Sequence, residues 1–335
     1  MKTRVLGKTG FEVSEVSLGT WQVGGGWGAT FDMEEAVRTV ETALDQGVTF
    51  VDTADVYGNG DSERAVAEAL RRRGLLGGDR VHFATKCGRR LRPHVADGYT
   101  REALTGFVED SLRNMGVEAL DLVQLHCPPT DVYYRPEVFA AMDDLVKQGK
   151  IRHYGVSVER VEEALKAIEF PRVATVQIIY NMFRQRPAER FFTEAAARNV
   201  GIIVRVPLAS GLLTGKMRRD TVFAAGDHRF FNREGASFDR GETFSGVDYE
   251  TGLRAVEALR EMFPDTAGGP TLAQTALRWI LMEPAVSCVI PGASRESQAR
   301  DNAAASELPA LTAEQMAAVR EVYDKYIRAW VHPCW

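Results

Sequence analysis

Residues 120–157 read LDLVQLHCPPTDVYYRPEVFAAMDDLVKQGKIRHYGVS, and this stretch decides the fold. The run 120–126 is suited to a buried strand, and the run 151–157 predicts a second strand. Residues 136–148, between them, predict a helix. A strand, a helix and another strand in this order indicate two parallel strands joined by a right-handed crossover.

The same alternation continues on both sides of this unit, after a β-hairpin around Gly7–Gly10. Further strands are predicted at 13–18, 48–53, 81–86, 173–180, 202–208 and 287–291. Further helices are predicted at 32–47, 62–73, 100–115, 159–169, 187–198, 249–262 and 272–282, and two more, at 297–305 and 313–327, follow the last strand.

Eight strands that alternate with helices fit a closed barrel or an open doubly wound sheet. Three observations favour the barrel: the count is eight, no G-x-G-x-x-G follows the first strand, and polar residues stand at the C-terminal ends of many strands. We therefore predict an α/β fold, a single (β/α)8 TIM barrel domain over residues 1–335, with an N-terminal β-hairpin and extra C-terminal helices. The connection 211–247 is the longest, and we expect it to fold over a bound cofactor.

Composition and charge argue against several other classes of protein. The formal net charge of -5 does not favour a nucleic-acid partner. We find neither a secretory signal nor an apolar run long enough to cross a membrane, so a cytoplasmic location is expected. The four cysteines form no C-x-x-C pair, which predicts free thiols and no metal site.

Four polar residues stand out because of their positions near predicted strand ends. Asp52 lies within the strand sequence FVDTA, Tyr57 follows five residues later, and Lys86 and His126 end two further strands. An ammonium group beside a tyrosine lowers the tyrosine pKa, and a carboxylate supplies the counter-charge for a buried lysine. A neutral histidine is suited to orient a carbonyl group. The four residues together therefore suit proton donation to a carbonyl oxygen while a hydride attacks the carbon.

Each of these residues also has a purely structural interpretation. Tyr57 alone fits a packing residue, Lys86 a surface lysine, His126 a strand-end residue, and Asp52 a capping carboxylate. What favours the catalytic interpretation is their coincidence at three neighbouring strands.

The chain resembles the aldo-keto reductases, and more closely the bacterial branch related to potassium-channel β subunits. The resemblance is carried, in family order, by LGTW (18–21), VDTADVYG (51–58), ATKCG (84–88), LDLVQLHCP (120–128), GKIRHYGVS (149–157), VQIIYN (176–181), VPLASGLLTGK (206–216) and VIPGASRESQARDN (289–302). It implies a catalytic tetrad of Asp52, Tyr57, Lys86 and His126, with Tyr57 as the general acid in reduction.

The resemblance also implies NADPH/NADP, lying extended across the barrel mouth, as the cofactor. The residues that it assigns to cofactor binding are Gly19, Thr20, Trp21 and Asp52 in the first segments, Ser157 and Gln177 at the carboxamide, Pro207, Leu208, Ser210, Leu212, Thr214 and Lys216 around the pyrophosphate, and Gly292, Ser294, Arg295, Gln298 and Asn302 at the adenosine side. We expect NADPH rather than NADH, because Arg295 offers a charge for the 2′-phosphate.

Two positions depart from the family pattern. Val158 stands where the family often has Asn, which removes one carboxamide contact. Arg205 stands where the family often has an aromatic residue, and we predict that its planar guanidinium lies against the nicotinamide or contacts a phosphate. The alternative is an arginine paired with a carboxylate at the edge of the core.

The leading prediction for function is reduction of a small aldehyde or ketone substrate. A regulatory NADPH-binding subunit with little turnover and a keto-sugar nucleotide reductase remain as alternatives. Arg90 and Arg92 are candidates for contacting an acidic substrate, or else belong to a solvated loop, and Trp27 is a candidate pocket residue. The oligomeric state is left open.

Overall fold

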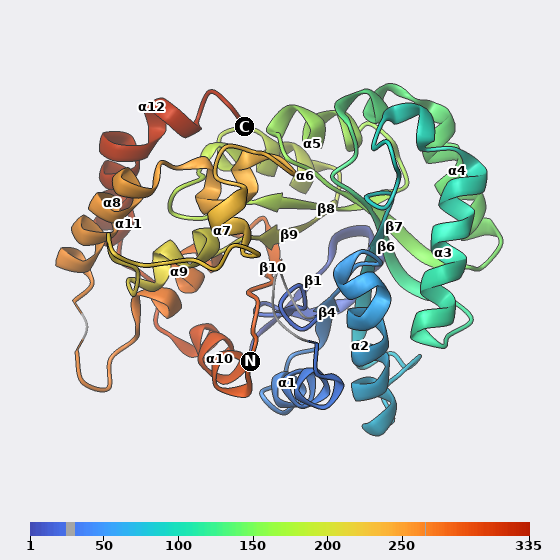
Figure 1. The fold of residues 1–335 in the computed structure, drawn as a ribbon, viewed down its shortest axis with the longest axis horizontal. Helices are drawn as coiled ribbons and strands as arrows, with labels where there is room; N and C mark the ends of the chain where they lie inside the picture. Colours follow the sequence, from blue (N-terminus) through green and yellow to red (C-terminus); the bar gives the residue numbers. More distant parts are fainter. Residues whose placement is uncertain (25–30, 265) are drawn as a thin grey trace.

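The fold is an eight-stranded parallel sheet surrounded by helices, described here from a computed structural model (Figure 1) that covers residues 1–24, 31–264 and 266–335. Each strand pairs in parallel with the next one along the chain. The strands are β3 (Leu18–Gly19), β4 (Phe50–Asp52), β5 (His82–Cys87), β6 (Leu120–His126), β7 (Ile151–Ser157), β8 (Val173–Ile179), β9 (Gly201–Arg205) and β10 (Val286–Val289).

The sheet closes on itself between β3 and β10. Parallel bridges join Val16 to Val289 and Gly19 to Gly292, and the Ser17 amide donates to the Val289 carbonyl over 2.8 Å. A Cβ atom on Gly19 would lie only 2.7 Å from the Ile290 carbonyl oxygen, so this approach requires glycine. The predicted barrel is thus confirmed, and the open doubly wound alternative is wrong.

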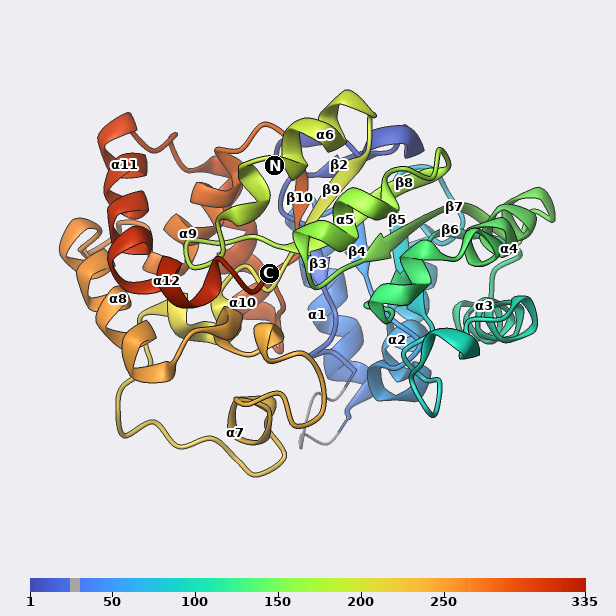
Figure 2. The same ribbon diagram turned by 90° about the horizontal axis from the view of Figure 1, so that it is seen from above.

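Helices cover the outside of the barrel, and α8, α11 and α12 gather on one side of it (Figures 1 and 2). Several begin at a side-chain cap, such as Asp32, which accepts from the Glu35 amide over 2.9 Å. The helices are α1 (Met33–Asp45), α2 (Asp61–Arg72), α3 (Arg101–Met115), α4 (Pro136–Lys147), α5 (Val161–Ala167), α6 (Phe191–Ala197), α7 (His228–Phe231), α8 (Tyr249–Met262), α9 (Leu272–Leu281), α10 (Glu296–Ala303), α11 (Ala313–Val322) and α12 (Arg328–Val331). Within the described ranges, none of them is long and apolar enough to span a membrane.

Four predicted elements differ from the structure by three or more residues at one end. The predicted strand 13–18 is divided: β1 (Thr3–Val5) and β2 (Glu12–Ser14) form the antiparallel hairpin, and the barrel strand β3 begins only at Leu18. The predicted strand 202–208 ends at Arg205, because Val206 turns to φ 50°. The helix predicted at 187–198 starts at Phe191, after a 3-10 turn, and the one predicted at 313–327 ends at Val322, before a π-helical turn.

The barrel interior has an apolar layer toward the N-terminal ends of the strands. Its members come from the strands and from the hairpin segment beneath them: Leu6, Val13, Phe50, Ala84, Leu122, Ile203, Cys288 and Ile290. Successive side chains of a strand point to opposite faces, so residues two positions further along also point inward. This alternation places Asp52, Lys86, Gln124 and Arg205 in the layer above, toward the C-terminal mouth of the barrel.

Candidate active site

Lys86 is the centre of the polar layer, and it is fully buried. Its ammonium group forms a close ion pair with Asp52 and donates to the Thr53 carbonyl over 2.9 Å and to the Tyr57 hydroxyl over 3.3 Å. Burial acts to lower the pKa of Lys86, but Asp52 and Tyr57 outweigh it and hold the pKa above its ordinary value. The lysine therefore stays charged beside the tyrosine oxygen.

The second oxygen of Asp52 is held by two amides. Gln124 and Gln177 each donate from Nε2 to Asp52 Oδ2, over 3.0 and 2.8 Å. A buried carboxylate needs such partners, because an unpaired buried charge is strongly unfavourable. From the sequence we assigned Gln177 to the nicotinamide carboxamide, and its side-chain nitrogen thus already donates to Asp52.

Tyr57 begins a short 3-10 turn (Tyr57–Gly60) after β4 and is partly exposed at the mouth. Burial raises the pKa of its hydroxyl, and the opposing effect of Lys86 does not cancel the increase. The lowering effect of lysine that we expected is therefore present, although the net pKa lies above 10. A tyrosine with this pKa carries its proton at neutral pH and is able to donate it.

His126 ends β6, with its ring centre 5.8 Å from that of Tyr57. Burial first, and then the cations Arg89 and Lys86, hold its pKa well below 6.5, so the ring is neutral as predicted. Its Nε2 lies 3.4 Å from the Arg89 Nη1, and its Nδ1 has no hydrogen-bond partner among the described residues.

Arg89 and Glu242 are site residues that our sequence analysis missed. Arg89 follows β5 and forms a close ion pair with Glu242, which belongs to a 3-10 turn (Arg240–Glu242) of the long connection 211–247, called the strap below. The signal for Arg89 was the pair Arg89-Arg90 after ATKCG, but we singled out Arg90 and Arg92 instead. Arg90 pairs with Asp110 over 3.3 Å, and Arg92 donates to backbone carbonyls of its own loop.

Arg205 extends this ion-pair chain across the mouth. Its guanidinium donates to Glu242 over 3.2 Å, to Glu159 over 2.8 Å and to the Val158 carbonyl over 3.0 Å. The structure therefore shows the alternative interpretation of Arg205, an arginine paired with carboxylates, while its contact with a cofactor stays a prediction. Val158 itself is fully buried.

Segments that carry residues assigned to the cofactor contact one another and the strap. The bridge from Gly19 to Gly292 joins the first assigned segment to the last. Ser210, in the 3-10 segment Ala209–Thr214 after β9, donates to the Glu242 carbonyl over 3.1 Å, which ties this loop to the strap. Near the N-terminus of α10, the Ser294 amide and hydroxyl donate to Gln298, and Asn302 donates to the Gly292 carbonyl over 3.2 Å. Trp27 lies outside the described residues.

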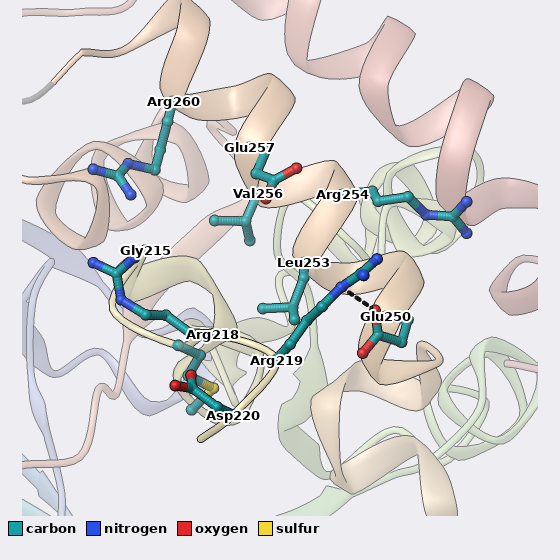
Figure 3. A pocket seen from close by; sticks show the side chains of 11 residues that line it. Gly215, Arg218, Arg219, Asp220, Glu250, Leu253, Arg254, Val256, Glu257 and Arg260 are labelled. Atoms are coloured by element: carbon teal, nitrogen blue, oxygen red, sulfur yellow. Dashed lines mark ion pairs between the residues drawn. The ribbon is translucent and has the colours of Figure 1, made fainter.

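A cavity of about 360 Å³ lies between residues 215–220 and α8 (Figure 3). Its lining includes Arg218, Arg219, Glu250 and Arg260, and Arg219 pairs with Glu250 over 2.8 Å. None of the tetrad residues and none of the residues assigned to the cofactor line it. Its lining residues Gly215 and Met217 flank Lys216, so the cavity borders the loop assigned to the pyrophosphate.

His228, in the strap, packs its ring edge-on against Trp21, with 4.8 Å between the ring centres. Burial lowers the pKa of His228 to about 4. Above pH 6.5 the ring is neutral in both the folded and the unfolded chain. Between pH 6.5 and 4 only the unfolded chain binds the proton. As the pH falls through this range, His228 should therefore lower the free energy of unfolding by about 1.4 kcal/mol per pH unit. Urea unfolding of His228→Gln should show a pH dependence that is shallower by this amount, and identical pH profiles for the two proteins would contradict the assignment.

The closed barrel, with Asp52, Lys86 and His126 near the C-terminal ends of its strands, has the arrangement that is typical of barrel enzymes. The sequence matches the Aldo/keto reductase family over residues 15–324, and the chain belongs to this family. This confirms the resemblance and the predicted class, an aldo-keto reductase type of oxidoreductase.

Three similar proteins illustrate the relationship. Aldo-keto reductase YhdN of Bacillus subtilis is 31% identical over 300 residues, which are 89% of this chain and 86% of that protein. A probable voltage-gated potassium channel subunit beta of Arabidopsis thaliana is 30% identical, with 93% of each chain covered. The structure of an aldo/keto reductase from Klebsiella pneumoniae in complex with NADP and acetate has a TM-score of 0.71 and 25% identity, with 96% of each chain covered.

Proposed function

We propose that this protein reduces an aldehyde or ketone to an alcohol with NADPH, and that Tyr57 is the general acid. The observation that carries the proposal is the Lys86 ammonium, which is bonded to Asp52 and also lies 3.3 Å from the Tyr57 hydroxyl. When bound, NADPH supplies a hydride to the carbonyl carbon. The family to which the chain belongs supports this class of reaction.

The residues of the chain handle the proton. Tyr57 donates its proton to the carbonyl oxygen as the electron pair of the C=O bond moves onto that oxygen. The charged Lys86 stabilises the phenolate that remains, and Asp52 keeps Lys86 in place. Neutral His126, across the mouth from Tyr57, orients the carbonyl oxygen. The same residues run the reaction in the opposite direction, with Tyr57 as the base.

The cofactor residues fit an extended dinucleotide phosphate. The exposed Arg295 precedes α10, and its guanidinium forms no ion pair within the described part of the chain. Ser294 and Gln298 lie beside it, at a helix N-terminus, where backbone amides favour an anion. We assign this corner to the 2′-phosphate, and Lys216 and the loop after β9 to the pyrophosphate.

Replacing Arg295 by alanine should weaken NADPH binding about tenfold and leave NADH binding nearly unchanged. The reason is that only NADPH carries the 2′-phosphate, and a charge-assisted hydrogen bond contributes roughly 1.5–3 kcal/mol in a protein. Fluorescence titration with each dinucleotide measures both affinities. Arg300→Ala is the matched control, because Arg300 lies five residues further along, on α10, and already pairs with Glu296. An equal loss for NADH and NADPH would refute the assignment of Arg295.

A carbonyl panel followed at 340 nm tests the proposed function as a whole. The panel contains 4-nitrobenzaldehyde, methylglyoxal and small ketones, each assayed with NADPH and with NADH. Turnover on at least one substrate supports the reductase. Stoichiometric NADPH binding without turnover over the panel would instead favour a regulatory binding role. The similarity to a channel β subunit is the reason for this alternative.

A further inference from the structure

Two arginines and two glutamates meet at the mouth, beside the catalytic residues. Arg89 comes from the loop after β5, Arg205 from β9, Glu159 from the turn after β7, and Glu242 from the strap. The side chains of all four are largely buried, and Arg89 keeps the largest exposed fraction, 20%. The balance of charge inside this cluster therefore determines which ligands the mouth accepts.

The two carboxylates of the cluster are not equally charged. The two arginines hold the pKa of Glu242 at about 2, against the effect of its burial. Burial raises the pKa of Glu159 to about 8, although Arg205 opposes the increase. At neutral pH the cluster thus contains two guanidinium cations and one firmly ionised carboxylate. One positive charge is left without a full counter-charge.

Arg89 is the member of the cluster that reaches the catalytic groups. Its Nη1 lies 3.4 Å from His126 Nε2 and 3.3 Å from Glu242 Oε2. The Nδ1 atom of His126 is buried and has no partner among the described residues. Burying an unpaired N–H donor costs more free energy than burying an unpaired nitrogen without hydrogen. This favours the tautomer with hydrogen on Nε2, in which the 3.4 Å approach of Arg89 Nη1 brings two donors together and is not a hydrogen bond. Two donors, His126 and Arg89, then stand side by side at the place where a substrate carbonyl binds.

We propose that Arg89 binds a carboxylate next to the reacting carbonyl, so that the preferred substrates are 2-oxo acids. This assignment rests on the proposed function, because it places the carbonyl oxygen between Tyr57 and His126. The carboxylate then lies on the adjacent carbon, within reach of the Arg89 fork, which matches the planar shape of a carboxylate.

The reaction itself is unchanged. The hydride forms the new C–H bond at the 2-carbon, the oxygen takes the proton of Tyr57, and a 2-hydroxy acid leaves.

A monoanion suits the site better than a phosphate group. A carboxylate would neutralise the remaining positive charge of the cluster, whereas a phosphate near its dianionic form would leave a buried negative charge, which is costly. Glu242 competes with the substrate for Arg89, because both terminal nitrogens of the guanidinium already donate to the Glu242 carboxylate, which an acid has to displace. Weakening Glu242 should therefore strengthen the binding of an acid.

Matched substrates test this assignment. Phenylglyoxylate and its methyl ester share the same ketone, but only the acid carries a negative charge. Glyceraldehyde 3-phosphate and glyceraldehyde form a second pair, in which only the first carries a phosphate. In the wild type, kcat/KM should be at least tenfold higher for the acid than for the ester. In Arg89→Gln that ratio should fall about tenfold, to near one, mainly through KM, and in Glu242→Gln it should rise. Arg113→Gln, which removes an arginine of α3 that is 68% exposed and pairs with Asp110, should leave the ratio unchanged.

A binding measurement separates this inference from the proposed function. Oxamate, an unreactive analogue of a 2-oxo acid, is titrated into the NADP⁺ complex of each protein and followed by tryptophan fluorescence. Loss of oxamate binding in Arg89→Gln supports the assignment even if no carbonyl is reduced, a result that would overturn only the proposed function. Four results would each overturn the assignment of Arg89. Two concern activity: equal kcat/KM for the acid and the ester, or a larger preference within the phosphate pair. Two concern binding: no oxamate binding in the wild type, or unaltered oxamate binding in Arg89→Gln.

Discussion

Tyr57→Phe should lower kcat for carbonyl reduction about 10³-fold, because the substitution keeps the ring and removes the only proton that we assign to the carbonyl oxygen. Loss of a positioned general acid typically costs roughly 10²–10⁴ in rate. The hydroxyl contacts Lys86 over 3.3 Å, and Lys86 keeps its other partners Asp52 and Thr53 without it. We therefore expect the variant to fold and to bind NADPH with nearly unaltered affinity.

Steady-state assays at 340 nm measure the loss of turnover, and fluorescence titration measures NADPH affinity. Tyr134→Phe is the matched control, since Tyr134 is 65% exposed and belongs to a surface turn. It should keep full activity. Turnover that survives in Tyr57→Phe at the wild-type rate would show that another group donates the proton.

Lys86→Met should have a second large effect, on both stability and activity. The substitution leaves Asp52 buried without its cation, and breaking a buried ion pair from one side typically destabilises a protein by about 3–5 kcal/mol. The phenolate of Tyr57 also loses its stabilising charge, so kcat should fall as strongly as in Tyr57→Phe. Urea unfolding measures the first effect and the 340 nm assay the second.

A double substitution separates the charge effect from the loss of packing. In Asp52→Asn/Lys86→Met neither charge is buried, so the double variant should recover much of the lost stability but none of the activity. Lys147→Met serves as the control, because Lys147 is 65% exposed and its pairing with Asp144 contributes at most about 1 kcal/mol. If Lys86→Met and Lys147→Met unfold at the same urea concentration, the buried pair does not stabilise the fold.

The sequence was sufficient to predict the barrel and the proximity of Asp52, Tyr57, Lys86 and His126 at its mouth, because both follow from local patterns. Buried parallel strands appear as apolar runs such as 120–126, and the residues at their C-terminal ends must meet at one mouth. The strand expected at 13–18 was wrong because an apolar alternation fits a hairpin strand and a barrel strand equally well. Only the pairing of Thr3 with Ser14 separates the two cases.

The cluster around Arg89 could not be predicted in the same way. Glu242 lies 153 residues from Arg89 along the chain, in a segment with no strand or long helix to fix its position. The inward direction of Arg205 followed from its place on a strand, but its partners Glu159 and Glu242 depend on how two loops fold back. The net pKa of Tyr57 likewise depends on burial, which no spacing in the sequence reports.

Glu242 contacts Arg89 and Arg205 at the same time, and it thereby couples the two sides of the mouth electrostatically. A ligand that draws Glu242 away from Arg89 changes the electrostatic field at Arg205, on the side assigned to the nicotinamide. Coupling of this kind is reciprocal, so the factor by which a bound acid changes cofactor affinity equals the factor by which the cofactor changes affinity for the acid. The strap thereby makes the affinities for acid and cofactor depend on one shared carboxylate.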